Sequence, residues 1–329
     1  MRIAVVIPAF NVAPWLCGAI LSLLDQTHPD WSVVIVDDGS TDTTAEVAAS
    51  YLDPRITLIR QDNAGVSAAR NRGIEAHCAL PAGPDRPFPG HDVIEASRIA
   101  PEKPDAFLFL DADDWLAPDA LALLAEALES APRAIAACGR YARIGASGLA
   151  RLAAPPPQGR LLERLLIRNL FVNGGHLLIR REAIEAVGGF RPDLSYGEDW
   201  EFWTRLALRG EFVALPSPAP VLFVRERPGS AYLRMATDPA AYQPAMEAIH
   251  RNAALVEHLG AARLGYLRHR AEAEIAWTIG RELIRRGQNR DGRRWLSHSV
   301  RSAPSLKRLG LIGLSWLRTG PFRPHQAAA

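Results

Sequence analysis

The sequence has few cysteines and no long hydrophobic run. Its three cysteines, Cys17, Cys78 and Cys138, are odd in number and form no Cys-x-x-Cys pair. A disulfide framework or a zinc site is therefore not expected, and a reducing cytoplasm is the natural compartment. No apolar run reaches the roughly 18–20 residues that span a bilayer. The first run, residues 3–7, stops at Pro8 and is too short for a signal-peptide core.

The chain also lacks a large net charge, but its charges are unevenly distributed. With 38 Lys+Arg and 36 Asp+Glu, the formal net charge is +2. Residues 1–250 carry −8 and residues 251–329 carry +10. Two interpretations stay open: the basic tail meets an anionic surface, or it packs against the acidic body.

What is present is an ordinary globular composition in a chain of 329 residues, with 48% hydrophobic and 22% charged residues. Disorder of the whole chain is excluded, because there is enough apolar surface to offset chain entropy. The length fits one large domain, or one domain with an appendage.

Apolar patterning in the first third alternates between strands and helices. We predict strands at 2–7, 31–36, 56–60 and 106–110, and helices at 12–25, 43–51 and 65–77. Thr43 and Glu46 have the spacing of a capping box. This alternation predicts an α/β fold with a mostly parallel sheet and right-handed crossovers.

Three predicted strand ends carry polar or acidic residues, namely Pro8–Asn11, Asp37–Ser40 and Asp111–Asp114. Parallel sheets bind ligands at the carboxyl ends of their strands, so these segments are expected to meet at one rim.

The remaining chain is divided by its prolines and by its helical pattern. Residues 78–104 contain six prolines, and we interpret them as a surface insertion at the opposite edge of the sheet. We predict a further helix, two strands and then a helical tail, at 198–209, 212–215, 220–224 and 240–302. Within the tail we expect a helix pair broken at Gly287 and residues 289–292.

The strand-end acids have both a functional and a structural interpretation. Asp111 and Asp113 after a buried strand suit Mg²⁺ or Mn²⁺, which prefer hard oxygen ligands; a solvated turn is the alternative. Asp37 and Asp38 can accept from the imide N–H of a uracil or thymine ring, or can simply cap the next helix.

Five ordered motifs then make the sequence recognisable. They are Pro8-Ala9-Phe10-Asn11, residues 36–42 (VDDGSTD), Asn63 with residues 65–73 (GVSAARNRG), residues 109–114 (FLDADD) and residues 197–200 (GEDW). In this order and spacing, the chain resembles glycosyltransferase family 2 from residue 1 to about residue 230.

The resemblance implies a GT-A fold and inverting transfer of a sugar from a nucleotide diphosphate sugar, with a divalent metal, Mg²⁺ or Mn²⁺. It implies that Pro8, Ala9, Phe10 and Asn11 line the nucleoside pocket, that Asp37 or Asp38 reads the base and that Arg70 lies near the nucleotide. It also implies that Asp111 contacts ribose or metal, that Asp113 is the principal metal ligand and that Asp199 is the catalytic base, with Glu198 as its rival.

The chain departs from the family pattern at one position. Arg227 stands where members often carry a metal-ligating histidine near a Gly-Ser pair. Arginine does not bind metal, but it can hold a phosphate with two hydrogen bonds, so metal dependence is expected to be weaker. His176, Trp200 and Trp203 are candidates for sugar contact, with burial in the core as the alternative.

The predicted organisation is a catalytic domain at residues 1–235 and a basic helical region at 236–329. The predicted function is transfer of a sugar, with a UDP-sugar as first choice, to a glycan or lipid-linked acceptor in surface polysaccharide synthesis. A nucleotidyltransferase would need a Gly-rich basic loop at residues 8–14, which is absent. A family member that only binds nucleotide sugar or a partner stays as the alternative.

The partners follow from this function. No nucleic acid is expected. Residues 306–317 mix leucines with basic residues, which is typical of a segment in a membrane interface, with packing in the core as the alternative. The chain is therefore expected in the cytoplasm, with contact at the inner face of the cell membrane.

Overall fold

A computed structural model describes residues 1–78, 103–227 and 236–317, except for the side chains of residues 314, 316 and 317. The chain divides into two compact units. We call residues 1–161 and 171–227 the N-terminal unit, and residues 162–170 and 228–329 the C-terminal unit. The predicted insertion lies almost wholly outside the described residues. The predicted boundary after residue 235 follows the undescribed segment 228–235, so it stays a prediction.

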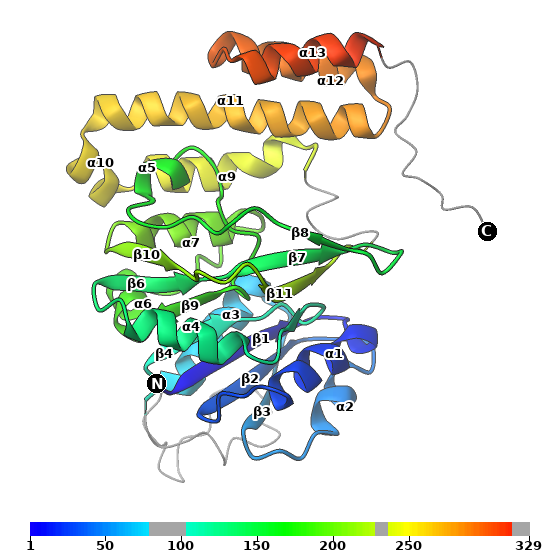
Figure 1. Cartoon of the computed structure of the whole chain (residues 1–329), viewed down its shortest axis with the longest axis vertical. Helices are drawn as coiled ribbons and strands as arrows, with labels where there is room; N and C mark the ends of the chain where they lie inside the picture. Colours follow the sequence, from blue (N-terminus) through cyan, green and yellow to red (C-terminus); the bar gives the residue numbers. More distant parts are fainter. Residues whose placement is uncertain (79–102, 228–235, 318–329) are drawn as a thin grey trace. The chain divides into compact units, whose positions relative to one another are not determined.

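A seven-stranded sheet forms the centre of the N-terminal unit (Figure 1). Its order is β10 (Glu211–Ala214), β6 (Ala134–Cys138), β9 (Leu177–Arg180), β4 (Ala106–Phe109), β1 (Ile3–Ala9), β2 (Trp31–Asp38) and β3 (Ile56–Gln61). Only β9 runs antiparallel to its neighbours. The register pairs Ala9 with Asp37, so the first two predicted rim segments leave the sheet side by side. The predicted mostly parallel sheet is confirmed.

Helices cover both faces of this sheet. Val5 and Ile7 belong to the core under α1 (Ala13–Leu24), α2 (Thr44–Ala49) and α4 (Ala120–Glu129). Val6, which alternates with them, faces α3 (Val66–Cys78) on the other side. α6 (Arg181–Val187) and α7 (Glu198–Ala207) complete that second layer, where Phe202 of α7 packs edge-on against Phe109. Alternation of side chains along each strand therefore fills two cores at once.

The start of α2 differs from the prediction. Thr43 makes no side-chain cap, so the proposed capping box with Glu46 is wrong. Asp42 takes this role instead, because its Oδ1 accepts from the backbone N–H of Thr44 at 3.0 Å.

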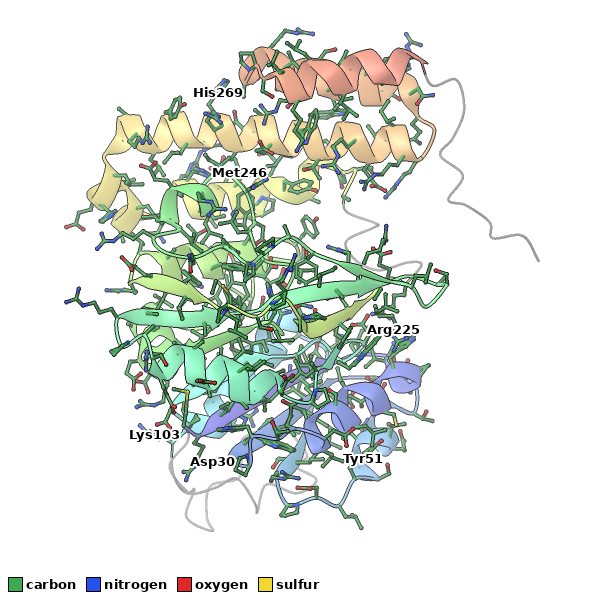
Figure 2. The ribbon with its side chains drawn as sticks, viewed as in Figure 1. Asp30, Tyr51, Lys103, Arg225, Met246 and His269 are labelled. Carbon is green, nitrogen blue, oxygen red and sulfur yellow. The ribbon has the colours of Figure 1, made fainter. Side chains whose placement is uncertain are left out.

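A second sheet has the order β5 (Trp115–Leu116), β11 (Pro220–Arg225), β7 (Arg140–Ile144) and β8 (Ala150–Leu152). β5 follows directly after Asp114, and Leu116 pairs with Leu222 of β11. This pairing brings the end of β11, marked by Arg225 in Figure 2, to the aspartates that follow β4.

The C-terminal unit is helical, as predicted. Its helices are α5 (Leu162–Leu165), α9 (Pro239–His250), α10 (Ala253–Leu259), α11 (Ala261–Arg285), α12 (Asn289–Ser302) and α13 (Leu306–Leu317). Trp277 and Ile284 of α11 pack on Leu296 of α12, which confirms the helix pair. Within the described ranges, no helix has both the length and the apolarity that a membrane span requires.

The break between α11 and α12 is shorter than predicted. Gly287 lies at it, with φ +80°. Asn289 and Gly292, however, lie inside α12. A Cβ at residue 292 would approach Ile284 Cδ1 to 2.8 Å, so this glycine allows close helix packing and does not end a helix.

Candidate active site

The aspartates after β4 differ in exposure and in role. The side chains of Asp111 and Asp113 are 31% and 18% exposed, and Asp114 is 2% exposed. Asp114 accepts from the backbone N–H of Arg225 at 2.9 Å and from the Asn173 amide at 2.7 Å. Asp114 therefore holds the two sheets together, while Asp111 and Asp113 face the rim.

Mutual repulsion is built into this cluster. Burial, and then the charge of Asp111, raise the pKa of Asp113, even though Arg227 acts in the opposite direction. Burial and the charges of Asp111 and Asp113 raise the pKa of Asp114 well above its usual value. A cation placed between Asp111 and Asp113 would relieve this repulsion.

Asn173 connects two of these carboxylates. Its amide nitrogen lies 3.1 Å from Asp111 Oδ2 and 2.7 Å from Asp114 Oδ2, and its oxygen accepts from the backbone N–H of Gly175 at 3.0 Å. Asn173 thus fixes the orientation of Asp111.

Arg70 joins the aspartate cluster to α7. Its guanidinium donates to Asp111 Oδ1 at 3.1 Å and to Glu198 Oε1 at 2.9 Å, and it lies 5.0 Å from the centre of the Phe190 ring. The residue is 5% exposed. Burial alone lowers the pKa of Arg70, but Asp111, Glu198 and Asp199 outweigh burial and the net shift is upward. Arg70 therefore stays charged and brings the two acidic motifs to one site.

Glu198 and Asp199 both lie in the first turn of α7, as predicted. Glu198 is held by Arg70, and its side chain is 13% exposed. Asp199 is half-buried, and its Oδ1 accepts from the backbone N–H of Trp200 at 2.6 Å. The helix dipole favours negative charge at this end.

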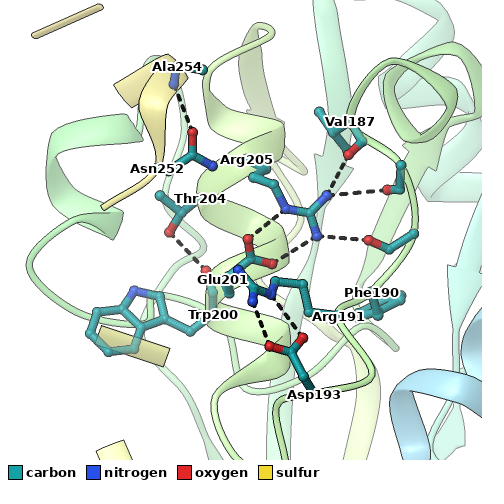
Figure 3. A network of polar contacts seen from close by, with 12 residues as sticks. Val187, Phe190, Arg191, Asp193, Trp200, Glu201, Thr204, Arg205, Asn252 and Ala254 are labelled. Atoms are coloured by element: carbon teal, nitrogen blue, oxygen red, sulfur yellow. Dashed lines mark hydrogen bonds and ion pairs between the residues drawn. The ribbon is translucent and has the colours of Figure 1, made fainter. Parts of the chain in front are cut away.

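A buried ion pair fixes α7 further along (Figure 3). Glu201, 2% exposed, accepts from Arg205 Nε at 2.7 Å and from Arg205 Nη2 at 2.8 Å. Arg205 also donates to the carbonyl oxygens of Val187 at 2.6 Å and Gly189 at 2.8 Å. This network ties α7 to the segment that carries Phe190, so Arg70 and Glu198 meet on a rigid support.

Arg227 lies against Asp113, the predicted principal metal ligand. Its Nε is 2.6 Å from Asp113 Oδ2, and its guanidinium carbon is 4.6 Å from the centre of the Trp15 ring. The structure therefore places this arginine at the acidic rim, where the resemblance puts a histidine.

The loops after β1 and β2 are linked through Asn11. Its Oδ1 accepts from the Thr41 N–H at 2.9 Å, and its own N–H donates to Ser40 Oγ at 3.0 Å. Asn11 adopts φ +50°, a left-handed conformation that asparagine tolerates better than most residues. Ala9 is buried, while Phe10 beside it is 48% exposed. Phe10 is therefore the apolar surface that this rim offers to a ligand.

Asp37 and Asp38 are both buried. Asp37 accepts from Arg60 Nε at 3.0 Å and from the Ser40 N–H at 3.2 Å. Asp38 accepts from Gln61 at 2.7 Å and from the backbone N–H groups of residues 64 and 65 at 2.9 and 2.8 Å. Both carboxylates organise the neighbouring loops, and base recognition by either stays a prediction.

His176 and the two tryptophans are core residues. His176 is 2% exposed, and its Nδ1 lies 2.8 Å from the Gly139 carbonyl oxygen; burial lowers its pKa to about 4. Trp200 and Trp203 are 5% and 1% exposed. None of the three presents a surface to a sugar ring, so the alternative interpretation, burial in the core, is the correct one for all three residues.

Two residues at this site escaped the sequence analysis as site residues: Trp15 and Phe190. Trp15 and Phe190 resemble any apolar residue of a core, so periodicity gives no signal for them. Asn173 begins the segment Asn173-Gly174-Gly175-His176, which the family resemblance places near the donor sugar and acceptor, but its contacts with Asp111 and Asp114 were not predicted.

The donor set suits a divalent cation that completes its coordination elsewhere. Within the described ranges, no group of three or more His, Cys, Asp or Glu residues is arranged to hold a metal. Asp111 and Asp113 supply two carboxylates, and Mg²⁺-type sites commonly use one or two carboxylates together with substrate phosphates. The residues fit this kind of site.

Comparison with known proteins agrees with this geometry. The family model described as Glycosyl transferase family 2 matches residues 4–77 and 99–188. The chain is 31% identical over 141 residues to the uncharacterized glycosyltransferase EpsJ of Bacillus subtilis. This match covers 42% of this chain and 34% of EpsJ. It is 37% identical over 76 residues to the putative teichuronic acid biosynthesis glycosyltransferase TuaG of the same species, covering 22% of this chain and 30% of TuaG. The matches span about a third or less of these relatives.

Solved structures match over more of the chain. S. aureus TarS 1-349 in complex with UDP-GlcNAc aligns with a TM-score of 0.64 at 16% identity, covering 97% of this chain and 88% of that one. Mannosyltransferase PcManGT from Pyrobaculum calidifontis, in complex with GDP-Man and Mn²⁺, aligns with a TM-score of 0.54 at 19% identity, covering 96% and 79%. At these identities the likeness concerns the fold, and it agrees with the predicted GT-A fold. This chain belongs to glycosyltransferase family 2 and has a GT-A fold with a C-terminal helical extension.

Proposed function

We propose that the protein is an inverting glycosyltransferase that moves a sugar from a nucleotide diphosphate sugar to a glycan or lipid-linked acceptor. The observation that carries the proposal is the Arg70 bridge between Asp111 and Glu198. It joins an acidic strand end, suited to the divalent cation that accompanies a nucleotide diphosphate, to an acidic helix start, suited to proton transfer. A UDP-sugar is the first choice of donor, and the UDP-GlcNAc complex of TarS supports this choice.

The donor would lie along the rim formed by β1, β2 and β4. Exposed Phe10 offers a ring on which a base can stack, and Asn11 holds the loop beside it. Asp37 and Asp38 are the proposed readers of the base. This arrangement would direct the diphosphate toward Asp111, Asp113 and Arg227.

Asp113 and Asp111 would hold the divalent metal, which when bound neutralises charge on the leaving diphosphate. The Mn²⁺ in the PcManGT complex supports a metal in this fold. Arg227 would share that task by donating to a phosphate oxygen, as its planar guanidinium allows. To donate to the phosphate, Arg227 would have to break its contact with Asp113.

Asp199 is the proposed base. As the acceptor hydroxyl attacks the anomeric carbon from the side opposite the diphosphate, its proton must pass to a carboxylate. Arg70 donates to Glu198 at 2.9 Å, so the carboxylate of Glu198 already serves to hold Arg70 in place. Asp199 lies one residue further into α7, is half-buried and accepts from the backbone N–H of Trp200.

The test compares Asp199→Asn with Glu198→Gln in the full chain. Nucleotide release from a panel of UDP-sugars and GDP-sugars, with glycan and lipid-linked acceptors, measures transfer. Asp199→Asn is expected to bind donor within a few-fold of wild type and to transfer at least roughly 100-fold more slowly, as loss of a general base implies. Glu198→Gln is expected to lose less rate. Near-normal transfer by Asp199→Asn would assign the base to another residue.

A binding protein without activity is the second candidate, because Arg227 already neutralises Asp113. It predicts binding of a UDP-sugar without hydrolysis or transfer across the same panel. Release of UDP by wild type that is lost in Asp199→Asn would exclude it.

The kind of acceptor also determines where in the cell the enzyme would act. A lipid-linked acceptor would place the enzyme at the inner face of the cell membrane, in the synthesis of a surface polysaccharide or glycoconjugate. The relation to the putative teichuronic acid enzyme TuaG supports this setting.

A further inference from the structure

The arginines of α11 and three arginines of α12 differ in their partners. Those of α11 have partners: Arg263 binds Glu163, Arg268 binds Glu247, and Arg285 and the adjoining Arg286 lie 3.6 and 3.1 Å from Glu282. Arg290, Arg294 and Arg301 of α12 are exposed, and within the described residues their side chains have no ion pair or hydrogen bond. We call these three residues the arginine stripe.

The three residues of the arginine stripe lie on one face of α12. At 100° per residue, its members lie within about 40° of one another around the helix axis. The buried residues Leu296 and Ser299 lie on the opposite side. The helix therefore packs by one side and presents three unpaired cations on the other.

Apolar side chains emerge from the helix that follows. Leu306 is 88% and Leu309 is 51% exposed at the start of α13. The inner side of α13 packs within the unit: Arg308 is buried, forms an ion pair with Glu274 and donates to the carbonyl of Ala303 at 2.6 Å. Arg308, which the sequence analysis grouped with the interfacial residues, is thus unavailable to a lipid. Leu306 and Leu309 remain as apolar anchors.

We propose that the arginine stripe, with Leu306 and Leu309, is a binding surface for an anionic lipid bilayer. Charge complementarity selects this partner: residues 251–329 carry +10 while the rest of the chain carries −8 and would be repelled by an anionic membrane. Exposed leucines at the start of α13, together with the unpaired cations of α12, suit the boundary between headgroups and acyl chains. The surface goes beyond the proposed transfer reaction, since lipid binding requires neither donor nor catalytic acid.

The experiment is cosedimentation of the full chain with vesicles of phosphatidylcholine alone or with phosphatidylglycerol. Wild type is expected to pellet with the anionic vesicles and not with the neutral ones. Each basic residue near an anionic bilayer typically contributes about fivefold to binding, so Arg290→Gln/Arg294→Gln/Arg301→Gln should lower the partition coefficient by about 100-fold. Leu306→Ser/Leu309→Ser should also weaken binding, through lost apolar burial.

The matched control is Arg133→Gln/Arg160→Gln/Arg191→Gln, which removes the same charge from exposed positions of the N-terminal unit. It should pellet nearly as wild type does, and all variants should keep the wild-type circular dichroism spectrum and UDP affinity. Unchanged pelleting of the stripe variant would overturn the proposal. So would failure of wild type to bind anionic vesicles while it binds soluble polyphosphate, which would assign the stripe to an anionic polymer. If the wild-type chain binds anionic vesicles but transfers no sugar, that result would contradict only the proposed function.

Discussion

At the scale of single residues, Arg70 has the most consequential position. It is a buried cation with two carboxylate partners that belong to different motifs. A buried charge is stable only when it is paired, so Arg70, Asp111 and Glu198 depend on one another. The same contacts fix the position of Glu198, which directly precedes Asp199 in the sequence.

Replacing Arg70 is expected to destabilise the fold as well as the site. Arg70→Met leaves Glu198 and Asp111 without their shared partner, at a cost of about 3 kcal/mol in the free energy of unfolding. Urea denaturation measures this. Arg191→Gln is the control, because its ion pair with Asp193 is exposed and should contribute less than about 1 kcal/mol. Equal losses in the two variants would show that burial of the Arg70 pairs contributes nothing.

The role of Asp113 can be separated from that of Arg227 by calorimetry of UDP binding. Asp113→Asn is expected to weaken binding at least roughly tenfold in Mn²⁺, since even changes behind a metal's ligands cost that much. In EDTA it should have little effect. Arg227→Gln should weaken binding in EDTA as well, because in the proposed arrangement its guanidinium would donate to the diphosphate directly. An equal loss for Asp113→Asn in both buffers would mean that Asp113 does not bind metal.

At the scale of elements, α3 packs unusually close to β1. A Cβ at residue 73 would lie 2.3 Å from Val6 Cγ1 and 3.1 Å from Val6 Cβ, so the helix approaches the strand where only glycine fits. This approach brings Arg70, one turn earlier on α3, to the rim. The proximity of helix and strand therefore serves the site.

Two glycine substitutions on helices should have opposite effects. Gly73→Ala is expected to destabilise the protein by about 1–3 kcal/mol, the usual cost of overpacking. Gly18→Ala on α1, where nothing lies within 4 Å of the added Cβ, should stabilise it by about 0.5–1 kcal/mol. Chemical denaturation of both variants checks the pair. A neutral Gly73→Ala would indicate that α3 can move away from β1 at no cost.

At the scale of the whole molecule, two buried histidines link stability to pH. Burial lowers the pKa of His77 and of His176 to about 4, from 6.5. Between these values the unfolded chain binds protons that the folded chain does not, so stability is lost as the pH falls from about 6.5 to 4. Each histidine can account for about 3 kcal/mol over that range.

The contribution of His176 can be isolated by substitution. His176→Gln can still donate to the Gly139 carbonyl but does not titrate, so its free energy of unfolding should fall less steeply with decreasing pH than that of wild type. His298→Gln, at an exposed position of α12, serves as the control and should keep the wild-type slope. If the unfolding free energy of His176→Gln depends on pH as steeply as that of wild type, His176 does not contribute to this pH dependence.

The sequence by itself determined the order of strands and helices in the first third of the chain and the convergence of three strand ends. Apolar periodicity is a local property, and parallel strands necessarily end at one edge, so the positions of Asp37, Asp111 and Asn11 follow from the pattern. The first turn of α7, with Glu198 and Asp199, was likewise predicted from local signals.

Only the tertiary structure decided which polar groups meet. Arg70 and Glu198 are separated by 128 residues, and Asn173 reaches Asp111 across 62. Local pattern carries no information about such pairs, because burial and charge pairing depend on distant segments brought together by the fold. For the same reason, the sequence placed Arg308 with the surface cations, whereas in the structure Arg308 is buried in an ion pair with Glu274. The exposed cations of this region are those of the arginine stripe on α12.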